Sequence, residues 1–211
     1  MINLLIVMFG VTMLYISVTS RIESYIKMLS VQGVILFIIS IIDFNYEFDL
    51  HFVLVIIETL LVKTILIPLF LIKVVRKNNI YREIEPYISN FYSIVICSII
   101  FICGFLLSYW ISDITLNINS LYFGFSMSTI VTGLFVIMTR KKIITHVMGY
   151  IILENGIFLM TLSIAYKIPF IVSLGILLDI FIAVFLLGIF VNRIHNTFHD
   201  IEVDKLTNLR D

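Results

Sequence analysis

The stretch YISNFYSIVICSIIFICGFLLSYWI, from Tyr87 to Ile111, contains no charged residue. It exceeds the roughly 20 apolar residues that an α-helix needs to cross about 30 Å of hydrocarbon. The rest of the chain has the same character, because 61% of its 211 residues are hydrophobic, 13% are charged and the mean hydropathy is +1.12. Soluble domains carry about 25% charged residues. The sequence therefore predicts an integral membrane protein and excludes a soluble globular domain.

Further apolar blocks flank this stretch on both sides, and short polar segments connect them. We expect an all-α, polytopic membrane protein of about seven transmembrane helices, in which neighbouring helices run antiparallel. The predicted spans are residues 2–19, 26–42, 51–75, 87–111, 120–139, 143–166 and 170–192.

The positive charges predict the orientation of these helices. Of the 14 Lys and Arg residues, twelve fall in alternate connections and in the C-terminal tail: Arg21, Lys27, Lys73, Arg76, Lys77, Arg82, Arg140, Lys141, Lys142, Arg193, Lys205 and Arg210. The opposite connections hold Lys167 together with several acidic residues. Because basic loops are retained in the cytoplasm, we expect the N-terminus outside and the C-terminus in the cytoplasm.

The predicted spans group into four segments. They are an N-terminal three-helix unit (1–86), a connecting transmembrane helix (87–111), a C-terminal three-helix unit (112–192) and a cytoplasmic tail (193–211). With these bounds the two three-helix units have the same orientation. The second helix of each unit carries a polar residue followed by glycine, Gln32-Gly33 and Asn155-Gly156. We therefore predict a parallel repeat of three plus one plus three helices, and parallel repeats are known among membrane transporters.

Several classes of function lack the residues that they need. The formal net charge is zero, whereas nucleic-acid binding needs a basic face. Cys97 and Cys103 lie in one apolar block at a spacing that does not suit a disulfide or a metal site. His51 and His146 lie near opposite sides of the membrane, so they do not clasp one haem. We expect no cofactor, no metal site and no catalytic residue in this chain, which by itself is then not an enzyme.

Ionisable residues inside the predicted spans are the candidates for function: Glu58, Lys63, Glu154 and Asp179. Each costs about 2.5–3.5 kcal/mol at a helix centre on the insertion scale. Ser or Thr would fill a structural role at lower cost, so a functional role is the default interpretation. The alternative is a set of static salt bridges that lock helices together, although buried ion pairs stabilise a fold only weakly.

Depth in the membrane narrows this set. Lys63, Glu154 and Asp179 lie near the bilayer midplane on three different predicted helices, at a rise of about 1.5 Å per residue. Glu58 is a poor intrahelical partner for Lys63, which we expect to face another helix. We hypothesise that Glu154 exchanges protons while Lys63 and Asp179 form a pair that sets its proton affinity. His146, near the cytoplasmic end of its helix, is a weaker candidate for the proton path.

Pro68 follows Lys63 within the same predicted span. Proline has no backbone N–H, so the carbonyl of Thr64 loses its helical partner. The sequence therefore predicts a kink and a backbone carbonyl open to a polar partner, one residue from Lys63.

Three segments carry a resemblance to a known family. They are Glu58-Thr-Leu-Leu-Val-Lys63-Thr-Ile-Leu-Ile-Pro68-Leu, Gly149-Tyr-Ile-Ile-Leu-Glu154-Asn155-Gly156, and the stretch from Gly175-Ile-Leu-Leu-Asp179 to the end of the tail, Val203-Asp-Lys-Leu-Thr-Asn-Leu-Arg210. These segments resemble hydrogenase-4 component E, a membrane subunit of energy-converting nickel–iron hydrogenases such as formate hydrogenlyases. The C-terminal three helices are also similar to the K-type subunit of respiratory complex I and to the C subunit of multisubunit sodium/proton antiporters.

The resemblance implies a function. Glu154 takes the position of the mid-membrane glutamate that is proposed to carry protons in the relatives, and Asp179 that of an acid in the next helix. The chain would be a non-redox subunit in the cytoplasmic membrane of a prokaryote, beside antiporter-like subunits, with the nickel–iron centre and iron–sulfur clusters on partner subunits. It would contribute a path for H⁺ or Na⁺. Two other functions stay open: a structural adaptor that bridges larger membrane subunits, and a stand-alone ion-coupled transporter.

Overall fold

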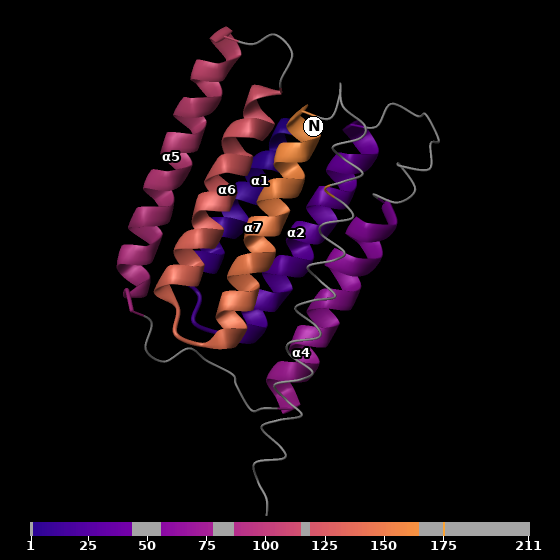
Figure 1. The fold of residues 1–211 in the computed structure, drawn as a ribbon, viewed down its shortest axis with the longest axis vertical. Helices are drawn as coiled ribbons and strands as arrows, with labels where there is room; N and C mark the ends of the chain where they lie inside the picture. The colour runs from indigo at the N-terminus through magenta and orange to yellow at the C-terminus, as the bar shows by residue number, and fades with distance from the viewer. Residues whose placement is uncertain (1, 44–55, 78–86, 115–118, 165–174, 176–211) are drawn as a thin grey trace, which may run out of the picture. The chain divides into compact units, whose positions relative to one another are not determined.

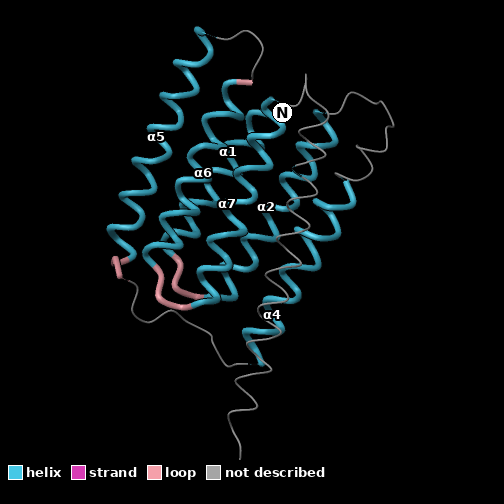
Figure 2. Tube along the Cα trace, in the orientation of Figure 1, coloured by secondary structure: helices cyan, strands magenta, loops and turns pink. Residues whose placement is uncertain are grey.

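A computed structural model of the chain describes residues 2–43, 56–77, 87–114, 119–164 and 175. Every regular element in these residues is a helix (Figures 1 and 2), as the sequence predicts. In chain order the elements are α1 (Ile2–Val18), α2 (Ile22–Asp43), η1 (Glu58–Leu66), α4 (Ile67–Lys77), α5 (Asn90–Ile114), α6 (Ser120–Thr139) and α7 (Ile143–Ile164). The π-helix η1 continues directly into α4.

These helices fall on the first six predicted spans, with η1 and α4 together forming the third. The ends differ by a few residues, since hydropathy reports the length of an apolar block and not the hydrogen bonds that end a helix. For example, α2 begins at Ile22 rather than at residue 26. The predicted seventh span, 170–192, lies outside the described residues except for Gly175.

Several of the described helices suit a membrane. Four are long and apolar enough to cross one, over Ile22–Ile42, Asn90–Ser112, Ser120–Thr139 and Ile144–Ser163, and the shorter helix Ile2–Val18 is apolar as well. The chain is therefore a multi-pass membrane protein. The count of seven spans and their orientation stay predictions.

Basic residues from two connections, Arg76 and Arg140, contact the ends of other helices. Arg76 Nε, at the end of α4, donates to Glu23 Oε1 at the start of α2 over 3.1 Å. Arg140, just after α6, donates from its guanidinium to the Ser17 carbonyl at 3.1 Å and to Asn90 Oδ1 at 3.5 Å. These contacts bring the ends of α1, α4 and α6 together with the starts of α2 and α5, which fits the predicted alternation of basic connections.

Arg140 differs from a plain loop residue, because its side chain is buried with only 2% of the residue exposed. The Ser17 carbonyl lies in the last turn of α1, where carbonyls have no partner within the helix. The guanidinium therefore satisfies the end of α1, a role that hydropathy alone does not reveal.

The helices α6 and α7 approach each other closely at glycine. A Cβ atom added to Gly133 would lie 2.7 Å from the backbone nitrogen of Leu153 and 2.9 Å from the carbonyl oxygen of Gly149. Small residues allow such approaches between membrane helices, which associate mainly through van der Waals contact. This contact fixes the part of α7 that carries Glu154.

Candidate functional site

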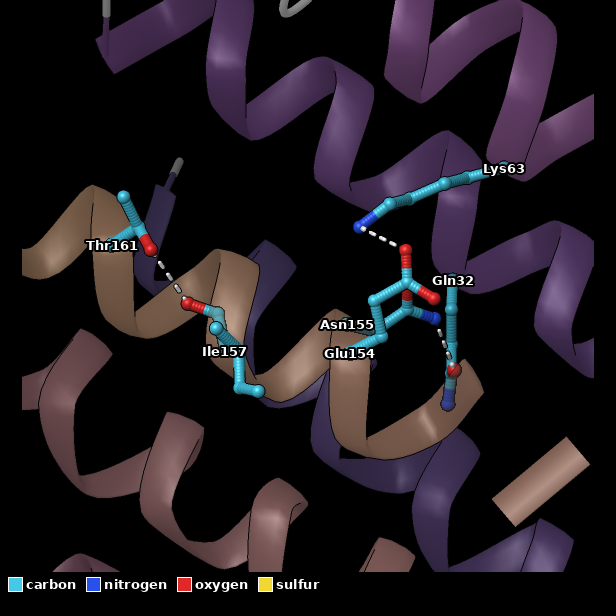
Figure 3. A network of polar contacts seen from close by, with 6 residues as sticks. All are labelled: Gln32, Lys63, Glu154, Asn155, Ile157 and Thr161. Atoms are coloured by element: carbon cyan, nitrogen blue, oxygen red, sulfur yellow. Dashed lines mark hydrogen bonds and ion pairs between the residues drawn. The ribbon is translucent and has the colours of Figure 1, made fainter. Parts of the chain in front are cut away.

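The site centres on a buried ion pair between η1 and α7. Lys63 Nζ lies 3.8 Å from Glu154 Oε1, and the two side chains are 2% and 4% exposed (Figure 3). This distance is that of an ion pair and exceeds the range of a direct hydrogen bond. Lys63 thus does reach across to another helix, and the two residues that the sequence placed at similar depth lie side by side.

An aromatic ring also contacts the ammonium group of Lys63. Lys63 Nζ lies 4.6 Å from the centroid of the Phe158 ring. Phe158 is one turn beyond Glu154 on α7, so the carboxylate and the ring lie on the same helix face. A cation over an aromatic face gains about 2 kcal/mol when both groups are desolvated. Nothing in the sequence distinguishes Phe158 from the other 17 of its 18 phenylalanines.

Lys63 lies in η1, where backbone hydrogen bonds span five residues instead of four. The Ile67 N–H donates to the Val62 carbonyl, and Thr64 Oγ1 donates to the Thr59 carbonyl at 2.8 Å. Single turns of π-helix occur frequently at functional sites. The kink that the sequence predicts at Pro68 stays a prediction, and the π register is a separate feature that a proline does not encode.

The carbonyl that Pro68 leaves without a helical partner has found one on a neighbouring helix. Ser30 Oγ, on α2, donates to the Thr64 carbonyl at 2.8 Å. Ser and Thr side chains commonly satisfy backbone groups freed by proline in membrane helices. The predicted polar partner is therefore a serine hydroxyl.

Glycine allows α2 and η1 to meet next to the ion pair. A Cβ atom added to Gly33 would lie 2.6 Å from Thr64 Oγ1 and 3.1 Å from Thr64 Cα. Any larger residue at position 33 would push η1 away from α2. The neighbour of Thr64 in the chain is Lys63, so this contact helps to fix the depth and direction of the lysine.

Two amides join α2 to α7 on the other side of the pair. Asn155 Nδ2 donates to Gln32 Oε1 at 3.1 Å (Figure 3), and Gln32 Nε2 donates to Thr12 Oγ1 on α1 at 2.9 Å. Gln32 is 0% exposed and Asn155 1% exposed. Asn155 Oδ1 is buried without a hydrogen-bond partner among the described residues. A band of polar side chains therefore runs from α7 through α2 to α1 beside the charged pair.

The described part of the chain does not show Asp179, Glu58 or His146, the other predicted site residues, in contact with this ion pair. Asp179 lies outside the described residues, and so does the side chain of Glu58. The predicted pair of Lys63 with Asp179 therefore stays a prediction. His146 is half-buried near the start of α7, about 12 Å along the helix from Glu154 at about 1.5 Å per residue.

The arrangement can hold a proton at either of two groups. In a dry site desolvation disfavours both charges, while the opposite charge restores them. Small changes in the separation of Lys63 and Glu154 therefore change the proton affinity of each. Within the described residues, no group of three or more His, Cys, Asp and Glu side chains could hold a metal ion.

Comparisons with known proteins relate this chain to membrane subunits of oxidoreductase complexes. Residues 121–211 match the family NADH-ubiquinone/plastoquinone oxidoreductase chain 4L. An uncharacterized protein of Mycobacterium tuberculosis is 26% identical over 192 residues, which cover 90% of this chain and 86% of that protein. Hydrogenase-4 component E of Escherichia coli K12 is 31% identical over 78 residues, which cover 37% of this chain and 36% of that protein. No solved structure matches the chain.

The matched family segment contains Glu154, Asn155 and Phe158, whereas Lys63 and Gln32 precede it. The resemblance to hydrogenase-4 component E that the sequence indicates is confirmed, and residues 121–211 of this membrane protein are similar to NADH-ubiquinone/plastoquinone oxidoreductase chain 4L, the K-type subunit.

Proposed function

We propose that this chain is a non-redox membrane subunit of an energy-converting hydrogenase-type complex, and that Glu154 with Lys63 forms a proton-exchanging site within the membrane. The family match and the similarity to hydrogenase-4 component E support a membrane subunit of a respiratory-type complex. Antiporter-like chains would be its neighbours in the cytoplasmic membrane of a prokaryote. The nickel–iron centre and the iron–sulfur clusters would lie on partner subunits.

The buried ion pair is the observation that carries this proposal. A carboxylate and an ammonium at 3.8 Å with almost no exposure cost several kcal/mol of desolvation, about as much as their attraction returns. A proton that reaches Glu154 leaves a buried ammonium beside a neutral acid. That ammonium then favours release of the same proton. Such a site accepts and releases protons as the distance between its two groups changes.

A structural adaptor is the second candidate, because the same residues also hold three helices together. The pair joins η1 to α7, and the amide bridge of Gln32 and Asn155 joins α2 to α7. A structural adaptor needs these contacts between helices but does not need Glu154 to bind and release a proton. The two candidates therefore differ in what happens when Glu154 keeps its hydrogen bonds and loses its charge.

The Glu154→Gln variant separates these candidates. Glutamine keeps the volume and the hydrogen-bonding capacity of glutamate but removes the titratable proton. In the complete complex in reconstituted vesicles, we expect assembly to persist and coupled proton uptake to be lost. Glu23→Gln is the matched control, because Glu23 pairs with Arg76 at the partly exposed end of α2 and should keep wild-type uptake. Wild-type uptake in Glu154→Gln would favour the adaptor.

A further inference from the structure

Gln32 and Asn155 lie at equivalent positions in two similar segments. In α2 the residues Gln32, Gly33, Leu36 and Ser40 have the spacing of Asn155, Gly156, Leu159 and Ser163 in α7. Each member of both sets is buried. The separation between equivalents is 123 residues, and Gly10 of α1 has the same relation to Gly133 of α6.

Residues related by this separation also touch each other. The Asn155 amide donates to Gln32, and the Arg140 guanidinium donates to the Ser17 carbonyl, both across 123 residues. The similarity does not extend to the packing of the glycines, because Gly10 meets Phe125 of α6 whereas its equivalent Gly133 meets Leu153 of α7.

Gln32 and Gly33 contact the residues that follow Glu154 and Lys63 in the chain. Gly33 contacts Thr64, which follows Lys63, and Gln32 contacts Asn155, which follows Glu154. The segment of α2 between these contacts therefore acts as a spacer. Its two side contacts determine how far η1 and α7 stand apart at the level of the ion pair.

We propose that Gln32 is a positioning residue, whose amide bridge to Asn155 sets the distance between Lys63 and Glu154 and so the proton affinity of Glu154. This effect on proton affinity holds whether or not the complex pumps. Its consequence for transport rests on the function proposed above.

Other titratable groups on the helices around Glu154 also affect its proton affinity, so the test must leave them unchanged. From η1, Lys63 faces Glu154, and Glu58 is on the same element. Residues 28–42 of α2 and all of α6 contain no Asp, Glu, Lys, Arg or His, although α6 carries Tyr122. On α7 itself, Tyr150 and His146 are titratable and lie toward its start. The variants below leave all of these groups unchanged.

Exchange of the two amides tests the spacer directly. Gln32→Asn shortens the bridge by one methylene, Asn155→Gln lengthens it by one, and the double variant keeps the combined length. In each single variant, loss or lengthening of the bridge should separate the charges, which raises the proton affinity of Glu154 by about tenfold at an effective dielectric constant of about 20. The double variant should return the affinity toward the wild-type value.

The measurement is an infrared titration of the carboxyl band in the full-length chain within its complex. Glu154→Gln removes the band and so identifies it. Ser40→Ala is the control, because buried Ser40 bonds to the Leu36 carbonyl of its own helix and does not touch the bridge. Gly33→Ala supplies a second route, since its Cβ would push Thr64 and should shift the midpoint in the same direction.

Distinct outcomes separate this proposal from the proposed function. Wild-type midpoints in Gln32→Asn, Asn155→Gln and Gly33→Ala would overturn the positioning role, even if Glu154→Gln abolishes proton uptake. A folded double variant whose midpoint stays with the single variants would also overturn it. Shifted single variants with a restored double variant would support it, even if Glu154→Gln retains wild-type uptake.

Discussion

Lys63 brings a positive charge into a buried position, and three kinds of contact explain how it is tolerated. The Glu154 carboxylate neutralises it at 3.8 Å, and the Phe158 ring covers it at 4.6 Å. Ser30 meanwhile satisfies the carbonyl of Thr64, the next residue in the chain. The buried lysine is therefore stabilised by an ion pair, by a cation–π contact and by a hydrogen bond that satisfies the neighbouring backbone carbonyl.

Loss of the lysine charge should be more damaging than loss of the glutamate charge. The glutamine of Glu154→Gln keeps a carbonyl oxygen that accepts from the ammonium, whereas the methionine of Lys63→Met has no donor for the carboxylate. Lys63→Met leaves the Glu154 carboxylate buried beside an apolar side chain, a change that costs about 3–5 kcal/mol when one partner of a buried pair is removed. We expect a marked fall in thermal stability and in assembled complex. Lys73→Met, on the exposed face of α4, should change stability by no more than about 0.5 kcal/mol.

A double change isolates the pair from the rest of the site. Lys63→Met together with Glu154→Gln removes both charges, so assembly should recover while coupled proton uptake stays absent. Thermal melting and quantitative co-purification measure the first effect, and vesicle uptake measures the second. If the double variant is as unstable as Lys63→Met, the damage does not come from an unpaired Glu154.

Part of this site could be predicted from residue chemistry alone. Charged residues in apolar spans stand out, and their depth follows from helix length, so Lys63 and Glu154 were found from the sequence. Which groups meet depends on how the helices cross, and that is decided by distant contacts such as Gly33 with Thr64. Gln32 was interpreted only as a mark of the repeat, because a buried amide in an apolar block does not name its partner.

At the scale of elements, a hydrogen bond from α2 satisfies a backbone carbonyl of η1. Its π register contains hydrogen bonds that span five residues, and the Thr64 carbonyl lies just before the point where Pro68 interrupts the ladder. Ser30 of α2 supplies the hydroxyl that this carbonyl accepts. Hydropathy predicts an apolar span over residues 51–75, but it carries no information on the π register or on the bond from Ser30 of α2.

Ser30 and Pro68 should therefore be energetically coupled. Ser30→Ala leaves the Thr64 carbonyl without the serine hydroxyl, and an unsatisfied buried acceptor costs about 1–3 kcal/mol. Pro68→Ala restores a backbone N–H near that carbonyl, so the double variant should be more stable than Ser30→Ala alone. Thermal melting of the four chains gives the coupling energy.

A matched control keeps that comparison specific. Ser112→Ala removes a hydroxyl that bonds to the Tyr109 carbonyl of its own helix at an exposed position, so it should be close to neutral. Simple addition of the Ser30 and Pro68 effects would show that the two residues do not share the Thr64 carbonyl.

At the scale of the whole molecule, the site draws on both of the predicted three-helix units. Lys63 and Gln32 come from residues 1–86, whereas Glu154, Asn155 and Phe158 come from the segment that matches the chain 4L family. The family segment thus contains the acid, and the N-terminal unit adds the base and the spacer. Under the function proposed above, residues 1–86 supply one of the two charged groups of the proton-exchanging site.

The orientation of the chain in the membrane is tested by cysteine labelling. The clustering of Arg76 and Arg140 at one end of the described helices shows which connections share a side, and the positive-inside rule predicts that this side is cytoplasmic. Arg140 itself is a poor labelling site because it is buried, and the neighbouring Lys141 is exposed. The background chain should carry Cys97→Ser and Cys103→Ser, which removes both native thiols.

Single cysteines at Asn45 and Asn117 should then react with a membrane-impermeant reagent added outside intact cells. Cysteines at Asn78, Lys141 and Asn208 should react only after the membrane is opened. The expected pattern requires an odd number of crossings between residues 45 and 78 and again between residues 78 and 117. Reaction of position 78 from outside would contradict the seven-helix arrangement, because every downstream segment would then change sides and the basic connections would face outward.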